Sequence, residues 1–407
     1  MRGVSAGIDI GTGTVTTVVL SRNKGDLPSI LGAGQARSDG VRKGTVVDHE
    51  ALAAAIKKSA LAAAKEANVS IKEAAVTFSG ASIRSSLSRG VVAVSRADGE
   101  ITQDDVRRSL QAAESLHLKN ANREIVHLSP RAFWVDGEGD IKDPVGMVGM
   151  RLETEALIIE GDKRALQNLG KSLDGAGISI WDWIFSPLVC SRVVLTKEQR
   201  ELGVMLLDIG AGNSSYGIWR EGSLLDAGVI PVGGDLATHD IAVMLKTKVE
   251  VAEAIKRKYG HVSPESFSRG DVIKLAEFVE NDTETYSRKE LGEVIKARMA
   301  DVFELAAEPL HKGGRSLLLP AGVVLIGRAA MLPGIREFAK RELRLPVERA
   351  KISGVDLGKF AELVSAPAVA VSLWFLQESG GISESGISRP FAKTWPLFKN
   401  FLKVFLP

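Results

Sequence analysis

Residues 7–20 read GIDIGTGTVTTVVL, and residues 206–219 read LLDIGAGNSSYGIW. In each stretch an apolar run ends at Asp-Ile-Gly, passes through a turn of small residues and resumes with β-branched or aromatic residues in alternation. This pattern is typical of a β-hairpin with a tight turn. Because two stretches so far apart in the chain resemble each other, the sequence predicts two related lobes.

Helical periodicity appears between the predicted strands. It is clear at residues 50–67, where Leu52, Ile56 and Leu61 are expected on one side, and it recurs at residues 163–176 and 249–259. Strands that alternate with helices predict an α/β fold.

One internal segment departs from this alternation. Residues 90–159 open with a strand-like VVAVS, continue with a polar helix over 103–118 and close with two more strands, which predicts a compact inserted α+β unit. Near the end, a last apolar helix at 366–377 precedes ESGGISESGISRP, whose Gly and Ser content is typical of a flexible linker.

Composition excludes several classes of protein. The chain has 407 residues, more than one hydrophobic core usually supports, and a net charge of +2, which provides no overall field to recruit nucleic acid. Cys190 is the only cysteine, and the first residues lack the apolar core of a signal peptide, so we expect a reducing cytoplasm. The sequence contains no run of about 18 apolar residues, so it predicts no membrane-spanning helix.

The two hairpins have the chemistry of a phosphate site. A nucleotide with its metal needs inward-pointing backbone N–H groups, little side-chain bulk and a carboxylate for metal-bound water. Asp9 and Asp208 end the first strands and are the predicted Mg²⁺ ligands. The predicted phosphate contacts are the turn residues Gly11, Thr12, Gly13 and Thr14 together with Gly210, Ala211, Gly212 and Asn213. One such turn would be weak support, since glycine usually serves only a positive φ, but two copies favour a facing pair of clamps.

The paired turns resemble phosphate 1 and phosphate 2 of the superfamily that contains actin, sugar kinases and DnaK-type chaperones. Residues 323–335, VVLIGRAAMLPGI, resemble its adenosine loop, with Gly327 and Arg328 at the turn. In AEAIKRKYG, Glu253 and Lys256 resemble its ribose and adenine contacts, although spacing alone favours a solvated i,i+3 helix face. The order of the motifs matches the superfamily. The resemblance implies an actin-like, ribonuclease H-like duplicated fold with two lobes around a cleft for ATP and Mg²⁺.

Within that superfamily the chain resembles the FtsA family of bacterial cell-division proteins. The resemblance covers nearly the whole chain and includes GTVVDHEAL, TKEQRELGVMLLDIGAG, VIPVGG and the inserted unit. FtsA and the pilus protein PilM carry a small α+β subdomain, 1C, at this point, whereas actin carries its extra subdomain elsewhere. The implied division is 1–84, 158–197 and a closing helix at 364–378 for 1A; 85–157 for 1C; 198–240 and 312–363 for 2A; 241–311 for 2B; 379–390 for a linker; and 391–407 for an amphipathic membrane-targeting helix.

The resemblance also bears on catalysis. Where hydrolytic relatives have a glutamate before proline, this chain has Ser186 before Pro187, and a serine is not a useful base at neutral pH. Thr14 replaces a lysine seen in many relatives. The loss of a positioned base typically costs a factor of about 10² to 10⁴ in rate. We therefore expect an ATP-gated scaffold with at most weak ATPase activity and assign no catalytic residue.

The final residues, 389–407, read RPFAKTWPLFKNFLKVFLP. Wound as a helix, they place an apolar stripe on one side and lysines on the other, which suits the interface of an anionic bilayer. The predicted membrane contacts are Phe391, Trp395, Phe398, Lys399, Leu402, Lys403 and Phe405. The alternative is a tail folded onto the body or placed in a partner's groove.

The implied role is a scaffold that tethers FtsZ filaments to the cytoplasmic face of the inner membrane at the septum. Implied partners are the FtsZ C-terminal peptide on 2B, where Lys256, Arg257 and Arg298 are basic; further copies of the chain in a dimer or polymer; later division proteins through 1C; and no nucleic acid. A PilM-like pilus scaffold is the alternative. A sugar-kinase-like phosphotransferase would need a catalytic aspartate between the lobes, and no candidate stands out, although Asp235 and Asp240 lie shortly after VIPVGG.

Overall fold

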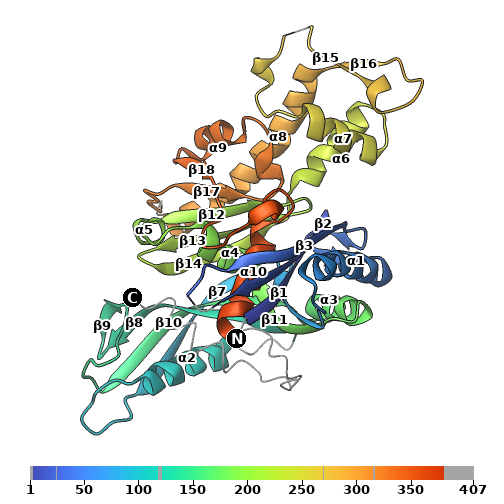
Figure 1. Cartoon of the computed structure of the whole chain (residues 1–407). Helices are drawn as coiled ribbons and strands as arrows, with labels where there is room; N and C mark the ends of the chain where they lie inside the picture. Colours follow the sequence, from blue (N-terminus) through green and yellow to red (C-terminus); the bar gives the residue numbers. More distant parts are fainter. Residues whose placement is uncertain (1–2, 24, 118–121, 269, 315–316, 380–407) are drawn as a thin grey trace.

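The structure is a computed structural model that describes residues 3–23, 25–117, 122–268, 270–314 and 317–379. Two lobes, each built on a sheet, are stacked on one another, and a smaller unit projects from each end of the stack (Figure 1). The linker and the membrane helix predicted from residues 379–407 lie outside the described residues, apart from Ser379.

Lobe I contains a five-stranded sheet of order β11-β6-β1-β2-β3. The first three strands in sequence are antiparallel, and β6 and β11 add in parallel beside β1. The strands are β1 (Gly3–Ile10), β2 (Thr14–Arg22), β3 (Ser29–Arg37), β6 (Glu73–Phe78) and β11 (Ser179–Phe185), with a small separate ladder of β4 (Val41–Arg42) and β5 (Thr45–Val46). The predicted first hairpin is therefore present as β1 and β2.

Lobe II repeats this sheet. Its order is β14-β13-β12-β17-β18, again with three antiparallel strands followed by two parallel ones. The strands are β12 (Val204–Ile209), β13 (Ser214–Arg220), β14 (Ser223–Ile230), β17 (Val323–Ile326) and β18 (Val347–Arg349). Because order and strand sense match, the prediction of two related lobes is confirmed.

Four helices cover the sheet of lobe I: α1 (His49–Ala67), α3 (Lys163–Gly175), α4 (Ser186–Val194) and α10 (Ala366–Ser379). Helix α1 begins after Asp48, whose carboxylate accepts from two backbone N–H groups of the first turn. Its buried face contains Leu52 and Ile56, as predicted, but Leu61 is 60% exposed. The prediction for Leu61 was wrong because a step of nine residues from Leu52 turns half-way round a helix of 3.6 residues per turn.

The apolar helix α10 is packed into lobe I. A side chain at Gly7 of β1 would overlap the backbone of Ser372, so the glycine permits close contact between strand and helix. Trp374 and Phe375 are buried, and the ring of Phe375 stacks on that of Trp181. Burial of large aromatic side chains contributes strongly to a core, which explains why this helix is apolar on all sides.

Lobe II has its own helices and a small projecting unit. The helices are α5 (Lys197–Leu202), α6 (Gly234–Met244), α7 (Val249–Tyr259), α8 (Arg288–Ala307) and α9 (Ile335–Leu343), with the short strands β15 (Val272–Lys274) and β16 (Thr285–Ser287) at the far end (Figure 1). Short 3₁₀ turns are η1 (Pro264–Ser266), η2 (Leu275–Glu277), η3 (Glu308–Gly314), η4 (Ala329–Met331) and, in lobe I, η5 (Gly358–Phe360). The helices and the sheet of lobe II enclose a second hydrophobic core, distinct from that of lobe I.

The inserted α+β unit is present and has one strand more than predicted. It comprises β7 (Arg84–Ala93), α2 (Gln103–His117), β8 (Arg123–Val135), β9 (Glu138–Ile141) and β10 (Arg151–Asp162), in an antiparallel sheet of order β7-β10-β8-β9. Its own core lies between α2 and the sheet. Strand β9 escaped prediction because EGDI is short and mostly exposed, so it lacks apolar alternation.

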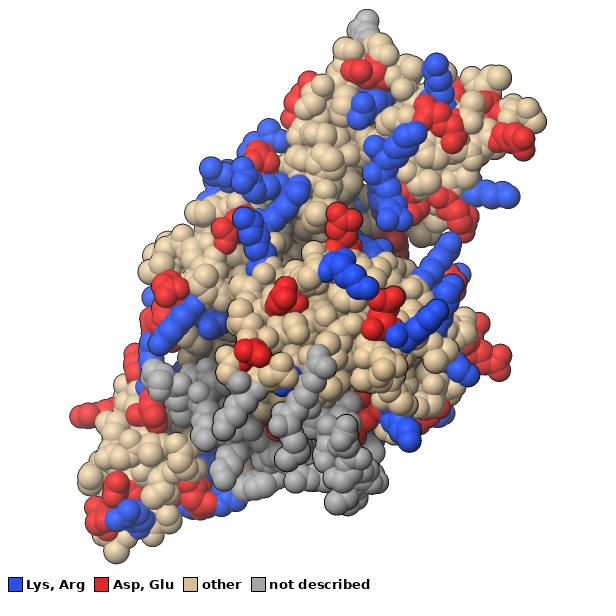
Figure 2. Space-filling model, viewed as in Figure 1, with Lys and Arg blue, Asp and Glu red and all other residues tan. Residues whose placement is uncertain are grey.

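Acidic and basic side chains are interspersed over the face displayed in Figure 2. Within the described part of the chain, no helix combines the length and the apolar character needed to cross a bilayer.

Candidate nucleotide site

The two small-residue turns close in the same way. The N–H of Gly11 donates to the carbonyl of Thr14 at 3.0 Å, and the N–H of Gly210 donates to the carbonyl of Asn213 at 3.1 Å. Both turns thus connect antiparallel strands at equivalent places in the two sheets.

These turns face each other between the lobes. A Cβ atom on Gly13 would lie 3.1 Å from the Cβ of Ala211, and one on Gly212 would lie 2.6 Å from Oγ1 of Thr12. The structure therefore brings together the residues predicted as phosphate contacts. Their glycines leave backbone N–H groups free of side-chain bulk, which is the arrangement that phosphate groups use.

Two half-buried carboxylates, those of Asp9 and Asp208, lie where the strands β1 and β12 enter the turns. Asp9 accepts hydrogen bonds from Oγ1 of Thr77 at 2.7 Å and from Oγ of Ser365 at 2.9 Å. Asp208 accepts from Oγ of Ser186 at 3.4 Å. Burial raises the pKa of Asp9, and burial together with the negative charge of Asp9 raises the pKa of Asp208 to about 7. The two carboxyl groups therefore interact electrostatically.

This donor set fits a magnesium ion that is shared with phosphate. Mg²⁺ is usually held by one or two carboxylates, with water and phosphate oxygens completing the octahedron. Among the described residues no group of three or more His, Cys, Asp or Glu side chains could hold a metal. Asp9 and Asp208 would hold the ion directly or through water. A bound Mg²⁺ would neutralise phosphate charge and relieve the repulsion between the carboxylates.

The predicted pair on α7 is joined to the lobe II turn. Nζ of Lys256 lies 2.6 Å from a carboxylate oxygen of Glu253 and donates to the carbonyl of Gly234 at 3.0 Å and to Oγ1 of Thr238 at 2.5 Å. The N–H of Gly234 in turn donates to the carbonyl of Gly210 at 2.9 Å. Lys256 is only 9% exposed, so the solvated helix face that spacing favours is wrong for this residue, whose ammonium group contacts the first turns of α6 instead.

The segment that resembles an adenosine loop lies against the same carboxylate. Gly327 has φ of +90°, and a Cβ atom there would lie 2.5 Å from Oδ1 of Asp208, so glycine is required on both grounds. Arg328 is exposed, and its positive charge lowers the pKa of Asp9, partly opposing the effect of burial. The segment forms the strand β17, a turn at Gly327 and, after Gly334, the helix α9.

Several residues of the site were not predicted from the sequence. Thr77 and Ser365 hold Asp9, Thr238 donates to Glu253 at 2.6 Å, and Ser79 accepts a hydrogen bond from Asn213 at 2.6 Å. Ser365 lies 356 positions from its partner. No local pattern marks a single serine or threonine as the partner of so distant a residue.

Comparison with known proteins agrees with this architecture. The model of the family "Cell division protein FtsA" matches residues 205–373, and that of the "SHS2 domain inserted in FTSA" matches residues 80–160. Relatives of similar length include the cell division protein FtsA of Bacillus subtilis (34% identical; 87% of this chain and 82% of the relative) and that of Neisseria meningitidis serogroup B (31%; 91% and 88%).

Solved structures share the fold at low sequence identity. The "PilM-PilN type IV pilus biogenesis complex" superimposes with a TM-score of 0.64 at 16% identity, covering 91% of this chain and 98% of that one. MreB5 of Spiroplasma citri bound to AMPPNP gives 0.52 at 12% identity, covering 93% and 97%. The fold is thus actin-like, with two lobes and an inserted subdomain. By its sequence matches over most of its length, the chain belongs to the FtsA family of cell division proteins.

Proposed function

We propose that the protein is an ATP-binding cell-division scaffold that tethers FtsZ filaments to the cytoplasmic membrane at the division septum. Membership of the FtsA family supports the role in division. The observation that supports nucleotide binding is the pair of facing glycine turns with a half-buried carboxylate at the base of each.

Each part of the cleft has a role in this proposal. The backbone N–H groups of the turns at 11–14 and 210–213 bind the phosphates, and Asp9 and Asp208 hold Mg²⁺. Glu253 and Lys256 face the ribose and adenine from α7, with Gly327 and Arg328 on the other side of the nucleoside. The MreB5 structure bound to AMPPNP, a neighbour of the same fold, is consistent with such a site.

Hydrolysis is expected to be slow in this cleft. Ser186 is the first residue of α4, is buried and donates to Asp208. A hydroxyl that is already used to hold a carboxylate does not deprotonate water at neutral pH. The proposed role of ATP is therefore to set the relation of the lobes rather than to drive rapid turnover.

The membrane attachment rests on residues outside the described part. Helix α10 ends at Ser379, and the amphipathic segment begins near residue 391. Residues 380–390 would connect the two as a flexible tether. In this proposal the amphipathic tail holds the body at the cytoplasmic face of the membrane.

Partner binding is proposed on three surfaces. The unit at 241–311 is the proposed dock for the FtsZ C-terminal peptide. Lys256 is buried, and Arg298 pairs with Asp240 at 2.7 Å and Asp301 at 2.8 Å, which leaves Arg257 as the exposed cation of the three. The inserted unit is the proposed contact for later division proteins, and copies of the chain associate through broad lobe surfaces.

The PilM-like pilus scaffold is the second candidate, because the fold of the PilM-PilN complex covers 91% of this chain. Pull-down of purified FtsZ by the protein carrying a disrupted tail separates the two. We expect the protein to retain FtsZ at micromolar concentration. Absence of retention would favour the PilM-like pilus scaffold. A sugar-kinase role is not supported by Asp240, since Arg298 occupies its carboxylate.

A further inference from the structure

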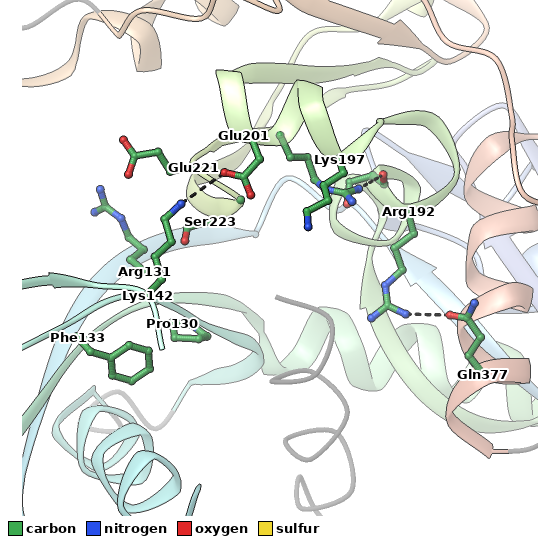
Figure 3. A pocket seen from close by; sticks show the side chains of 13 residues that line it. Pro130, Arg131, Phe133, Lys142, Arg192, Lys197, Glu201, Glu221, Ser223 and Gln377 are labelled. Carbon is green, nitrogen blue, oxygen red and sulfur yellow. Dashed lines mark hydrogen bonds and ion pairs between the residues drawn. The ribbon is translucent and has the colours of Figure 1, made fainter. Parts of the chain in front are cut away.

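A cavity of about 610 Å³ lies away from the nucleotide cleft, where the inserted unit meets both lobes (Figure 3). Its walls come from β8 and the residue after β9, from α4 and α5, from the turn between β13 and β14, and from the last turn of α10. None of the residues assigned to the nucleotide cleft lines it. Its size is within the range of about 300 to 1,000 Å³ typical of small-molecule sites.

The charges around this cavity are unbalanced. Five basic side chains and two acidic ones line it: Arg131, Lys142, Arg192, Lys197 and Arg200 against Glu201 and Glu221. The positive excess here exceeds the net charge of +2 of the entire chain. A cleft lined by one sign of charge concentrates counter-ions of the other sign.

Three of the five cations already have partners. Lys142 lies 3.4 Å from Glu201, and Arg131 lies 3.3 Å from Glu155. Arg200 donates to the backbone carbonyls of Ser191 and Leu195 at the end of α4. These contacts fix the walls of the cavity. Within the described residues Arg192 and Lys197 form no ion pair, and the negative charge of Glu378 acts on Arg192 without a salt bridge.

The guanidinium of Arg192 is held in place by neighbouring side chains, but some of its N–H donors have no hydrogen-bond partner among the described residues. Its guanidinium carbon lies 3.9 Å from the ring centroid of Trp374, and its Nη1 donates to Gln377 at 3.2 Å. Its Nε and Nη2 are buried and have no hydrogen-bond partner in the described part of the chain. Burial lowers the pKa of Arg192 to about 10, so it remains charged at neutral pH. Buried donors without acceptors are costly, which indicates a missing acceptor.

We propose that this cavity binds a phosphate-bearing anion, with Arg192 and Lys197 as its ligands and Lys142 and Arg131 at its rim. A guanidinium held by stacking presents a rigid fork that matches phosphate oxygens, and an ammonium adds a mobile point charge. Phe133 and Pro130 provide an apolar wall for the organic part of the ligand. Within the described residues, Lys197 makes no ion pair and is exposed on α5.

The anion could come from a soluble phosphate ester or from a phospholipid headgroup. Gln377 lines the cavity from the last turn of α10, just before the proposed tether. A flexible linker of about 11 residues has an r.m.s. span of roughly 18 Å, so a bilayer held by the tail lies within reach. The proposed tail would bring a headgroup within reach, but the cavity itself would bind either source without the tail.

The first experiment measures binding of inorganic phosphate to the full-length protein by calorimetry at constant ionic strength. It uses wild type and Gly210→Asp, in which the nucleotide cleft is blocked. We expect saturable binding that persists in Gly210→Asp and weakens roughly tenfold or more with Lys197→Ala or Arg192→Lys. Lys58→Ala, an exposed lysine on α1, is the matched control and should bind as wild type. No saturable binding, or equal affinity in all variants, would overturn the proposal.

The second experiment distinguishes the sources with phosphatidylglycerol vesicles and the full chain carrying Trp395→Glu and Phe398→Glu. Residual binding that Lys197→Ala removes identifies a headgroup. Absence of vesicle binding together with retained phosphate binding identifies a soluble ester. If the wild-type protein does not bind vesicles, the proposed membrane tether is wrong. The phosphate measurement still tests whether the cavity binds an anion. Binding of a poly-glutamate peptide through Lys197 without phosphate binding would replace the proposal by an acidic polypeptide site.

Discussion

Asn213, in the turn of lobe II, donates from Nδ2 to the backbone carbonyl of Ser79 in lobe I at 2.6 Å. Ser79 lies in the segment that leaves β6 and leads into β7, the first strand of the inserted unit. A Cβ atom on Gly44 would lie 2.7 Å from the same nitrogen, so the two lobes and the entry to the inserted unit meet at this amide. The turn at residues 210–213 is thus connected to the entry of the inserted unit through one side chain.

Removal of this bond should loosen the contact between the lobes. We expect Asn213→Ala to lower the free energy of unfolding by about 0.5 to 1.5 kcal/mol, and Asn213→Asp to lower it further, because a carboxylate would face the carbonyl oxygen of Ser79. Urea unfolding measures both, with Gln167→Ala on the exposed face of α3 as the control. Wild-type stability of Asn213→Asp would show that the bond does not join the lobes.

The nucleotide assignment predicts loss of ATP binding in two variants. Asp9→Ala removes a metal-holding carboxylate, and Gly210→Asp fills the turn and adds a negative charge beside the phosphates. A fluorescent-nucleotide titration should show at least about a hundredfold weaker binding in each. Asp174→Ala and Gly270→Asp, both away from the cleft, serve as matched controls. Wild-type affinity in a folded Asp9→Ala or Gly210→Asp protein would contradict the assignment.

Slow hydrolysis follows from the position of Ser186. Kinases turn over at about 1 to 100 per second, and the absence of a positioned base costs a factor of roughly 10² to 10⁴. Steady-state phosphate release with Mg-ATP should therefore fall below the kinase range by that factor. Asp9→Ala gives the background of contaminating activity. Turnover in the kinase range that Asp9→Ala abolishes would show that another group acts as the base.

The carboxyl of Asp208 predicts a pH dependence of stability in the nucleotide-free protein. Its pKa is about 7 in the fold against 3.8 ordinarily, so between these values the folded chain retains a proton that the unfolded chain has released. This contribution is complete below about pH 4 and is lost as the pH rises through about 7. Asp208→Asn should melt above wild type at about pH 8 and show a shallower decline by calorimetry. Asp174→Asn should match wild type. An equal change of melting temperature with pH in all three proteins would show that protonation of Asp208 is not linked to folding.

The tail prediction concerns residues 391–407. The full protein should co-sediment with anionic liposomes, and Trp395→Glu combined with Phe398→Glu should release it without change in ATP affinity. Burial of each aromatic side chain contributes roughly 1.5 to 3 kcal/mol, so two charges on that face are enough. Leu61→Glu, at an exposed apolar residue of α1, is the control and should sediment as wild type. Equal sedimentation of the double variant would refute the membrane anchor.

The sequence by itself determined the two hairpins, the two related lobes and the inserted unit. These features rest on local rules: a tight turn needs small residues, a strand alternates apolar and polar positions, and a helix repeats every 3.6 residues. Helix α7 was predicted with the bounds 249–259 that the structure has, since Ala252, Ile255 and Tyr259 follow that period. The placement of Asp9 and Asp208 at strand ends also followed from sequence, since each ends an apolar run.

Only the tertiary structure decided how those local pieces combine into a site. Thr77 and Ser365 reach Asp9 from other elements, Lys256 is buried against the Gly233–Gly234 turn, and Arg192 is fixed beneath α10 by Trp374. Contacts of this kind depend on how helices and sheets pack and on which face is buried, and a local pattern of residues does not record either. The raised pKa of Asp208 has the same origin, because desolvation and the nearby charge of Asp9 exist only once the two lobes are assembled.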